Sequence, residues 1–401
     1  MRNIHGFFIL LILLFGQAFV AAADWPQFLG PSHNGISPEK GINKNWRAKP
    51  PKVLWTVPMN DHGYAGPSVA SGVLYIIDHA GNQDIVRALN VNTGKKVWEY
   101  RYQDAAGNFY GFTRATPTVA NGKVYTISRL GQVLCLDAKT GKKVWSRSLV
   151  KDLQGRKPTW EYSMSALVDG KQVIVVPGSA KGTVAALDAG TGRTTWQGGG
   201  SDIPGYATPV LASINGVRQY VVFTGVSVIG VDTARGKLLW RCPWKTKDDV
   251  NAATPIVSGN TVFITSDYGR GCALVEVTGK GARIKWQNRL IQSHFTTPIL
   301  SGGFLYSTTD PNKLVCIEHA TGKVRWERRG FEKGGQMAVD GVLLAFEGAS
   351  GNLVMVKIAP NGYQELGRIR PLGGQSWTAP IAAGDKLIIR NQQTLACLSL
   401  K

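Results

Sequence analysis

The sequence predicts an all-β protein, an eight-bladed β-propeller made of four-stranded antiparallel blades. Three observations predict this fold: a tryptophan motif that recurs along the chain, a series of eight tight-turn dipeptides, and a last repeat whose missing strand stands near the N-terminus. The chain has 401 residues, of which 43% are hydrophobic and 18% are charged. That composition provides ample material for a packed core and excludes intrinsic disorder.

The tryptophan motif is clearest in Cys135-Leu-Asp137-Ala-Lys-Thr-Gly141-Lys-Lys-Val-Trp145. In five copies an acid-type residue lies eight positions before the tryptophan, and a sixth copy, ending at Trp286, has two extra residues. The Asp side chain can accept backbone N–H groups and Gly can adopt positive φ, so each copy predicts a β-hairpin. We predict a structural role, packing between neighbouring blades, for the tryptophans Trp55, Trp98, Trp145, Trp196, Trp240, Trp286 and Trp326.

A second kind of hairpin turn occurs eight times, each time between apolar strand residues. Its tips are Ser71-Gly72, Asn121-Gly122, Asp169-Gly170, Asn215-Gly216, Ser258-Gly259, Ser301-Gly302, Asp340-Gly341 and Gly384-Asp385. Two hairpins per repeat give four antiparallel strands, and about 43 residues per repeat is the length of a propeller blade.

The two ends of the repeat region are expected to close the ring. The eighth repeat stops at Leu395–Leu400, where a tryptophan strand should follow, and residues 52–58 provide such a strand at the other end. We predict that this N-terminal strand completes the last blade, which removes an open sheet edge.

We divide the chain into a signal peptide at residues 1–23, a coil lead-in at 24–51 that packs over one face, and the propeller at 52–401. The apolar run Phe7–Phe15 and the small residues Ala21–Ala23 indicate secretion, with a retained anchor helix as the alternative. We expect an exported protein, periplasmic or extracellular, with no transmembrane segment after signal cleavage.

The repeated motif resembles the tryptophan-docking motif of PQQ-like, quinoprotein-type β-propellers. Two groups of that family are relevant: eight-bladed quinoprotein dehydrogenases, which are enzymes, and BamB-like exported propellers, which are non-catalytic scaffolds of outer membrane protein assembly. The lead-in Trp25–Gly35 is also similar to that of exported PQQ-like repeat proteins.

The resemblance to the dehydrogenases implies pyrroloquinoline quinone (PQQ) held against Ca²⁺, a catalytic Asp and often a disulfide between adjacent cysteines. The five cysteines include no adjacent pair, and a bridge between Cys242 and Cys272 remains open. The nearest approach to a Ca²⁺ pair is Glu161 with Asn251, whereas Ca²⁺ takes 6–8 oxygen ligands. We therefore assign no catalytic residue and expect no cofactor, with PQQ and Ca²⁺ as the alternative.

A candidate binding funnel emerges when the blades are aligned on their turns and followed back to the start of each innermost strand. Its predicted residues are Tyr64, Arg114, Tyr162, Tyr206, His294, Phe295, Lys333 and Trp377. Aromatic rings with two cations could stack a planar or sugar-like ligand and hold a carboxylate. The alternative is that these rings only plug the channel. We expect the insertion Lys151–Glu161 to be a mobile loop over this funnel.

The net charge of +20 is the remaining signal, and many of its lysines and arginines flank the tryptophans. They form either a solvated rim or a surface attracted to anionic lipids or wall polymers. We expect protein or envelope-polymer partners, no nucleic acid, and a monomer. The leading hypothesis is an exported, non-enzymatic binding scaffold of the cell envelope. The alternatives are a PQQ-dependent alcohol or sugar dehydrogenase and a propeller that binds a small carbohydrate-like ligand in its funnel.

Overall fold

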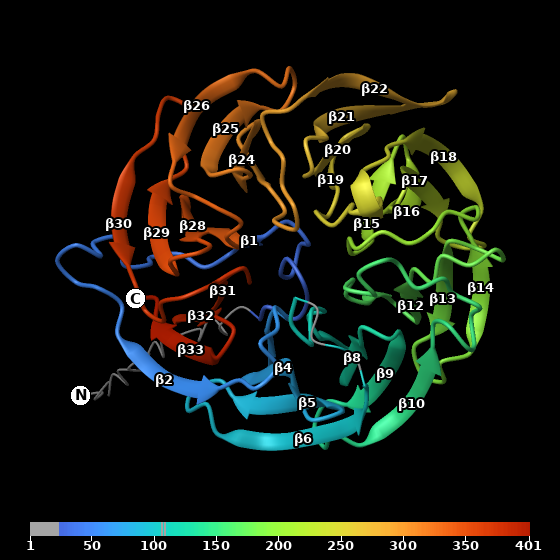
Figure 1. Ribbon diagram of the computed structural model, residues 1–401, viewed down its shortest axis with the longest axis horizontal. Coiled ribbons are helices and arrows are strands. Elements are labelled where there is room, and N and C mark those ends of the chain that lie inside the picture. Colours follow the sequence, from blue (N-terminus) through green and yellow to red (C-terminus); the bar gives the residue numbers. More distant parts are fainter. Residues whose placement is uncertain (1–23, 106, 108–109) are drawn as a thin grey trace, which may run out of the picture.

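Eight antiparallel sheets stand as blades around a central axis, which confirms the predicted eight-bladed, all-β architecture (Figure 1). The computed structural model describes residues 24–105, 107 and 110–401, so the predicted signal peptide lies outside the described residues. Within these ranges no helix has the length and apolar character needed to cross a bilayer.

Each of blades 1 to 6 runs in chain order from its inner to its outer strand. Blade 1 comprises β3 (Ser68–Ala70), β4 (Val73–Ala80), β5 (Gln83–Asn90) and β6 (Lys96–Gln103). Blade 2 comprises β7 (Thr118–Ala120), β8 (Lys123–Ile127), β9 (Gln132–Asp137) and β10 (Lys143–Ser148). Blade 3 comprises β11 (Leu167–Asp169), β12 (Gln172–Val175), β13 (Val184–Asp188) and β14 (Thr194–Gly198). Blade 4 comprises β15 (Val210–Ile214), β16 (Val217–Phe223), β17 (Ser227–Asp232) and β18 (Leu238–Pro243).

The 3₁₀ helix η1 (Lys247–Asp249) follows blade 4. Blade 5 comprises β19 (Ile256–Ser258), β20 (Thr261–Ser266), β21 (Gly271–Thr278) and β22 (Gly281–Asn288). Blade 6 comprises β23 (Ile299–Ser301), β24 (Phe304–Thr309), β25 (Lys313–Glu318) and β26 (Val324–Arg329). Blade 7 comprises β27 (Gln336–Val339), β28 (Val342–Glu347), β29 (Asn352–Lys357) and β30 (Glu365–Ile369). Blade 8 comprises β31 (Ile381–Ala383), β32 (Lys386–Arg390), β33 (Thr394–Ser399) and β2 (Val53–Pro58).

The turn chemistry read from the sequence accounts for the inner hairpins. At Ser71-Gly72, Asn121-Gly122, Asn215-Gly216 and Asp340-Gly341 both turn residues have positive φ, as tight two-residue hairpins require. Because each blade packs against a neighbour on both faces, its middle strands are apolar on both sides. Val173, Ile174 and Val175 in β12, for example, are completely buried.

Six of the seven tryptophans donate an indole hydrogen bond. Five of them bond across a blade boundary, from Nε1 to a backbone carbonyl of the next blade at 2.9–3.1 Å: Trp55 to Val91, Trp98 to Ala138, Trp145 to Ala189, Trp286 to His319, and Trp326 to Ala359. Trp240 instead donates to Gln219 of its own blade at 2.6 Å. The next copy of the tryptophan motif, in blade 5, is the one whose turn has two extra residues.

The ring is closed as predicted. Strand β2 pairs antiparallel with β33, and Trp55 stands opposite Cys397. A fully buried ion pair then ties blade 8 to the chain entering blade 1: the Arg390 guanidinium lies 2.9 Å from the Asp61 carboxylate. Arg390 also donates to the backbone carbonyls of Gly63 and Ala65.

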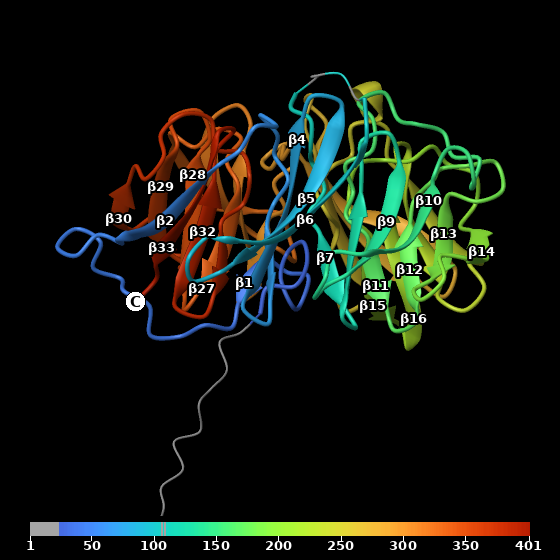
Figure 2. The same cartoon turned by 90° about the horizontal axis from the view of Figure 1, so that it is seen from below.

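The lead-in is more ordered than the predicted coil. Its residues Ile36–Ser37 form β1, which pairs in parallel with β27 as an additional strand of blade 7. Further upstream, Trp25 exchanges backbone hydrogen bonds with Val69 of β3. Figure 2 shows the lead-in along the lower face of the ring and η1 on the opposite, upper face.

The cysteines are free and buried, at Cys135, Cys242, Cys272, Cys316 and Cys397. The bridge between Cys242 and Cys272 that the sequence left open is not formed. The Cys272 sulfur lies 3.1 Å from Oδ1 of Asn288, and burial raises the pKa of its thiol to about 12. Such thiols behave as small core residues rather than as reactive groups.

Candidate functional site

A pocket of about 490 Å³ occupies the centre of the ring. The lead-in forms its floor with Trp25, Phe28, Leu29 and Gly35. Gly35 fits so closely there that a Cβ atom would lie 2.6 Å from the side chain of Ile299. The channel is therefore closed from the lower face, and its mouth is on the upper face, where Tyr110 and Tyr268 are exposed.

Aromatic side chains form a continuous arc on one side of the pocket. Tyr64 stacks on Trp377 with ring centroids 5.0 Å apart, and Trp377 contacts Phe295 at 5.3 Å. The arc continues from Phe295 to His294 and from His294 to Tyr268. A second group of aromatic side chains lies elsewhere on the wall. Tyr110 packs edge-on against Trp160, and the backbone N–H of Trp160 donates to the Tyr206 hydroxyl at 3.0 Å.

Small hydroxyl side chains at the starts of the inner strands tie neighbouring blades together. The backbone N–H of Thr116 donates to Ser165 Oγ at 2.9 Å, and the N–H of Ser165 donates to Thr208 Oγ1 at 3.0 Å. The Thr254 N–H donates to Thr297 Oγ1 at 3.1 Å in the same way. Thr116, Ser165, Thr208 and Thr297 all line the pocket, so it contains a tier of hydroxyl groups.

Seven of the eight predicted funnel residues line this pocket: Tyr64, Arg114, Tyr206, His294, Phe295, Lys333 and Trp377. Tyr162 does not. It is buried, packs against Gly131 and donates its hydroxyl to the Pro177 carbonyl. In blade 3 the strand β11 ends at Asp169 and β12 begins at Gln172, so the turn lies one residue later than the tip Asp169-Gly170 read from the sequence. Blade 3 has no marker proline to correct the alignment, which was therefore one residue out of register, and Ser163 takes the pocket position.

Several lining residues were missed because they do not stand at the start of an innermost strand, where the blade alignment looked. They lie in the lead-in, in the segments between blades or, for Tyr268, in the turn between β20 and β21: Trp25, Phe28, Tyr110, Trp160 and Tyr268. Of these residues, Trp160 is the one that the sequence could have indicated, since it stands in the insertion that was expected to cover the funnel. Hydrogen bonds connect this insertion to the ring, from the Gly155 N–H to the Leu149 carbonyl and from Arg156 Nε to the Gly178 carbonyl.

Arg114 is the cation of the blade 2 wall, and its guanidinium donates to the Trp160 carbonyl. Burial, together with the nearby charge of Arg129, lowers the pKa of Arg114 to about 10, so it remains protonated at neutral pH. Arg129 is almost fully buried and pairs with Glu161 at 2.5 Å. Glu161 also pairs with Lys157 at 3.2 Å.

The predicted pair for Ca²⁺, Glu161 and Asn251, has other partners. Two cations already neutralise Glu161. The amide nitrogen of Asn251 donates to the carbonyls of Thr224 and Trp244, and its oxygen accepts a bond from Ser266 at 2.6 Å. These donor atoms do not fit a shared calcium site.

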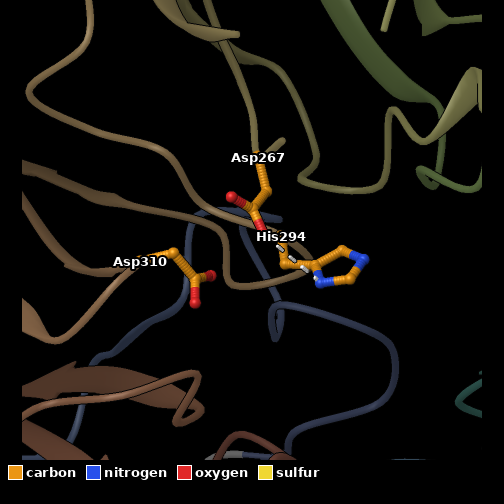
Figure 3. Close-up of side chains that lie close together, drawn as sticks. All are labelled: Asp267, His294 and Asp310. Carbon is orange, nitrogen blue, oxygen red and sulfur yellow. Dashed lines mark ion pairs between the residues drawn. The ribbon is translucent and has the colours of Figure 1, made fainter. Parts of the chain in front are cut away.

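Asp267, His294 and Asp310 form a second candidate metal cluster, with ligand atoms within 4.8 Å of one another (Figure 3). The Lys333 ammonium lies 3.3 Å from Asp267, 2.9 Å from His294 Nδ1 and 3.8 Å from Asp310, where a metal ion would compete with it. Burial and the neighbouring Asp267 raise the pKa of Asp310 to about 7. Burial and Lys333 lower the pKa of His294 to about 4. The cluster therefore fits an internal ammonium better than the Ca²⁺ of a quinoprotein centre.

Comparisons with known proteins agree with this architecture. Residues 81–328 match the family described as outer membrane protein assembly factor BamB. The chain is 24% identical over 324 residues to the BamB of Moranella endobia (strain PCIT), a match that covers 74% of this chain and 77% of that protein.

Solved structures extend the likeness. BamB from Moraxella catarrhalis superposes with a TM-score of 0.65 at 17% identity, covering 88% of this chain and 98% of that one. Quinohemoprotein alcohol dehydrogenase from Comamonas testosteroni superposes with a TM-score of 0.68 at 15% identity, covering 94% and 80%. At such low identities the likeness shows the fold alone, which both scaffolds and enzymes share.

Proposed function

The chain belongs to the family of outer membrane protein assembly factor BamB, and from that premise we propose that it is an exported, non-enzymatic scaffold of the cell envelope. Its partners are proteins, and it binds them through the loops of the upper face. It works in the periplasm or outside the cell. A rigid ring that displays loops on one face suits such a role.

The observation that carries the proposal is the position of Lys333. Its ammonium lies within 3.8 Å of Asp267, His294 and Asp310, the one group of side chains among the described residues that could hold a metal ion. A dehydrogenase of this fold would need a Lewis acid and a carboxylate base for the quinone and its alcohol. Here the Lys333 ammonium holds the carboxylates of Asp267 and Asp310, which supports a binding protein rather than a redox enzyme.

Two experiments test the proposal. In the first, purified protein is incubated with PQQ and Ca²⁺, and its absorption spectrum and reduction of a dye with alcohols are recorded. We expect no bound quinone and no dye reduction. Alcohol-dependent dye reduction by the loaded protein would overturn the proposal.

In the second, a photo-crosslinking amino acid replaces Tyr110 or Tyr268 on the upper face, or Val217 at the start of β16 as the control. All three side chains are exposed. In cells of the source organism we expect discrete crosslinks to envelope proteins from Tyr110 and Tyr268 and none from Val217. Equal crosslinking from all three positions would contradict an upper binding face.

A further inference from the structure

The central pocket has the charge of an anion site. Among its described lining residues the formally charged ones are Arg114 and Lys333, both cations. The carboxylates that hold Lys333, on Asp267 and Asp310, are not part of the lining. The Arg114 guanidinium donates to the Trp160 carbonyl, and Arg129 and Lys157 hold the neighbouring carboxylate of Glu161. A buried guanidinium is well suited to a carboxylate.

The same pocket also has an extended stacking surface. Tyr64, Trp377 and Phe295 stand next to one another with ring centroids 5.0 and 5.3 Å apart. These three residues stand at the entries to blades 1, 8 and 6, respectively, whereas Arg114 stands at the entry to blade 2, across the ring from blade 6 (Figure 1). A ligand lying against the aromatic arc can therefore direct an acidic group across the pocket to Arg114.

The pocket wall carries hydroxyl groups in addition to aromatic rings. Ser165, Thr208 and Thr297 each accept a hydrogen bond from a backbone N–H. An accepting hydroxyl still has its own proton to donate. A ligand rich in hydroxyl groups satisfies such a wall, whereas a flat aromatic acid would leave these groups without partners at a cost in affinity.

We propose that the central pocket binds a small carboxylated sugar of the hexuronate class, with its ring against Trp377 and its carboxylate paired with Arg114. The cavity of about 490 Å³ lies within the range of about 300–1,000 Å³ typical of small-molecule sites. The lead-in is part of this site, because Trp25, Phe28 and Leu29 close its floor. The mouth of this site opens on the proposed protein-binding face at Tyr110 and Tyr268, but the inference of a small ligand does not rest on protein binding.

Calorimetric titration of the full chain after signal removal tests the site with three probes. D-galacturonate has both the hydroxyls and the carboxylate, D-galactose has only the hydroxyls, and benzoate has only the carboxylate on a flat ring. We expect galacturonate to bind about tenfold or more tightly than either control, the usual worth of a hydrogen bond to a charged group. Galacturonate binding no tighter than galactose, or no tighter than benzoate, would overturn the proposal.

The variant Arg114→Gln locates the carboxylate. It should weaken galacturonate binding about tenfold or more, to the level of galactose, while galactose binding is unchanged. Arg328→Gln, on the exposed outer strand β26, is the matched control and should bind galacturonate like the wild type. Unchanged galacturonate binding by folded Arg114→Gln protein would contradict the assignment. The comparison of probes uses wild-type protein, so it decides the question even if this variant fails to fold.

Discussion

The glycine of the Thr-Gly turn meets two requirements in the same residue. Gly94, Gly141 and Gly192 have φ between 69° and 72°, a region that favours glycine. A Cβ atom at these positions would lie 2.6 to 2.8 Å from the indole ring of Trp55, Trp98 or Trp145, respectively. The turn thus closes its own hairpin and also provides the flat surface on which the preceding blade's tryptophan packs.

Alanine variants of two glycines in blade 2 distinguish the need for positive φ from the need for space beside the indole ring. Gly141 and Gly122 have nearly identical φ, 70° and 69°, but a Cβ at Gly141 meets Trp98 at 2.6 Å, whereas one at Gly122 has nothing within 4 Å. Both alanine variants incur the left-handed backbone penalty of about 1–2 kcal/mol. We expect Gly141→Ala to lose a further 1–3 kcal/mol, roughly the cost of overpacking, in urea unfolding. Equal losses in the two variants would show that backbone strain alone selects the glycine.

Single residues also show where the sequence stops being informative about the site. Aligning the repeats located the pocket residues Tyr64, Arg114, Phe295 and Trp377, because each stands three positions before the proline that precedes an innermost strand. The prediction fell on Tyr162, one residue too early, because the blade 3 turn follows Asp169 rather than including it, and no proline there corrects the count. Asp267 and Asp310 were missed, since they follow the second strands of blades 5 and 6, and only the folded ring brings them to Lys333 at the entry to blade 7.

At the scale of elements, the cluster around Lys333 joins three blades. The turns after β20 and β24 contribute Asp267 and Asp310, the segment before β23 contributes His294, and the segment before β27 contributes Lys333. Tyr268 packs against His294 at the pocket mouth. Burial is the largest cause that raises the pKa of Asp310; the neighbouring Asp267 raises it further, and Lys333 lowers it.

This cluster predicts a pH dependence of stability. Unfolding returns the pKa of Asp310 from about 7 to about 3.9, so between these values the folded state binds more protons than the unfolded state. The contribution of Asp310 to the free energy of unfolding therefore falls as pH rises from about 4 to 7. Urea unfolding of wild type and Asp310→Asn at pH 4, 5, 6 and 7 isolates it. We expect the wild type to lose stability relative to the variant across this window, and a constant difference would contradict the assignment.

Elements differ in how well local sequence specifies them. Inner hairpins were predictable because Asn-Gly and Ser-Gly turns carry their own geometry, as positive φ at Asn121 and Gly122 illustrates. Strand β1 was not, because Ile36–Ser37 pairs with Ala338–Val339, some 300 residues away, and a two-residue strand has no periodicity to read. The pocket floor depends on this lead-in, so the sequence predicted a funnel where the structure has a pocket with a floor at its lower end.

For the whole molecule, the circular arrangement depends on the junction between the first and last repeats. Each of blades 1 to 7 takes its four antiparallel strands from one continuous stretch of chain, with β1 added to blade 7, but blade 8 takes its outer strand β2 from the N-terminal side. The Arg390–Asp61 pair and the bonds from Arg390 to Gly63 and Ala65 reinforce this junction from the inside. The pairing of β2 with β33 was predictable from the missing strand, whereas the buried ion pair had no signature in the repeats.

Removing Arg390 tests how much this junction contributes. Arg390→Met leaves the Asp61 carboxylate buried without its cation, since both side chains are fully buried. We expect a loss of about 3–5 kcal/mol in the free energy of unfolding, as for other broken buried pairs. Arg101→Met is the control: it removes an exposed pair with Glu99 and should cost about 0–1 kcal/mol.

The double variant Arg390→Met with Asp61→Asn identifies the cause of that loss. Because it removes the unpaired charge as well as the cation, we expect it to regain part of the stability lost in Arg390→Met. If Arg390→Met instead costs no more than Arg101→Met, the ion pair adds nothing measurable, and the pairing of β2 with β33 closes the ring unaided. If the double variant regains nothing, the loss comes from the backbone bonds to Gly63 and Ala65, and the junction is held by hydrogen bonds rather than by charge.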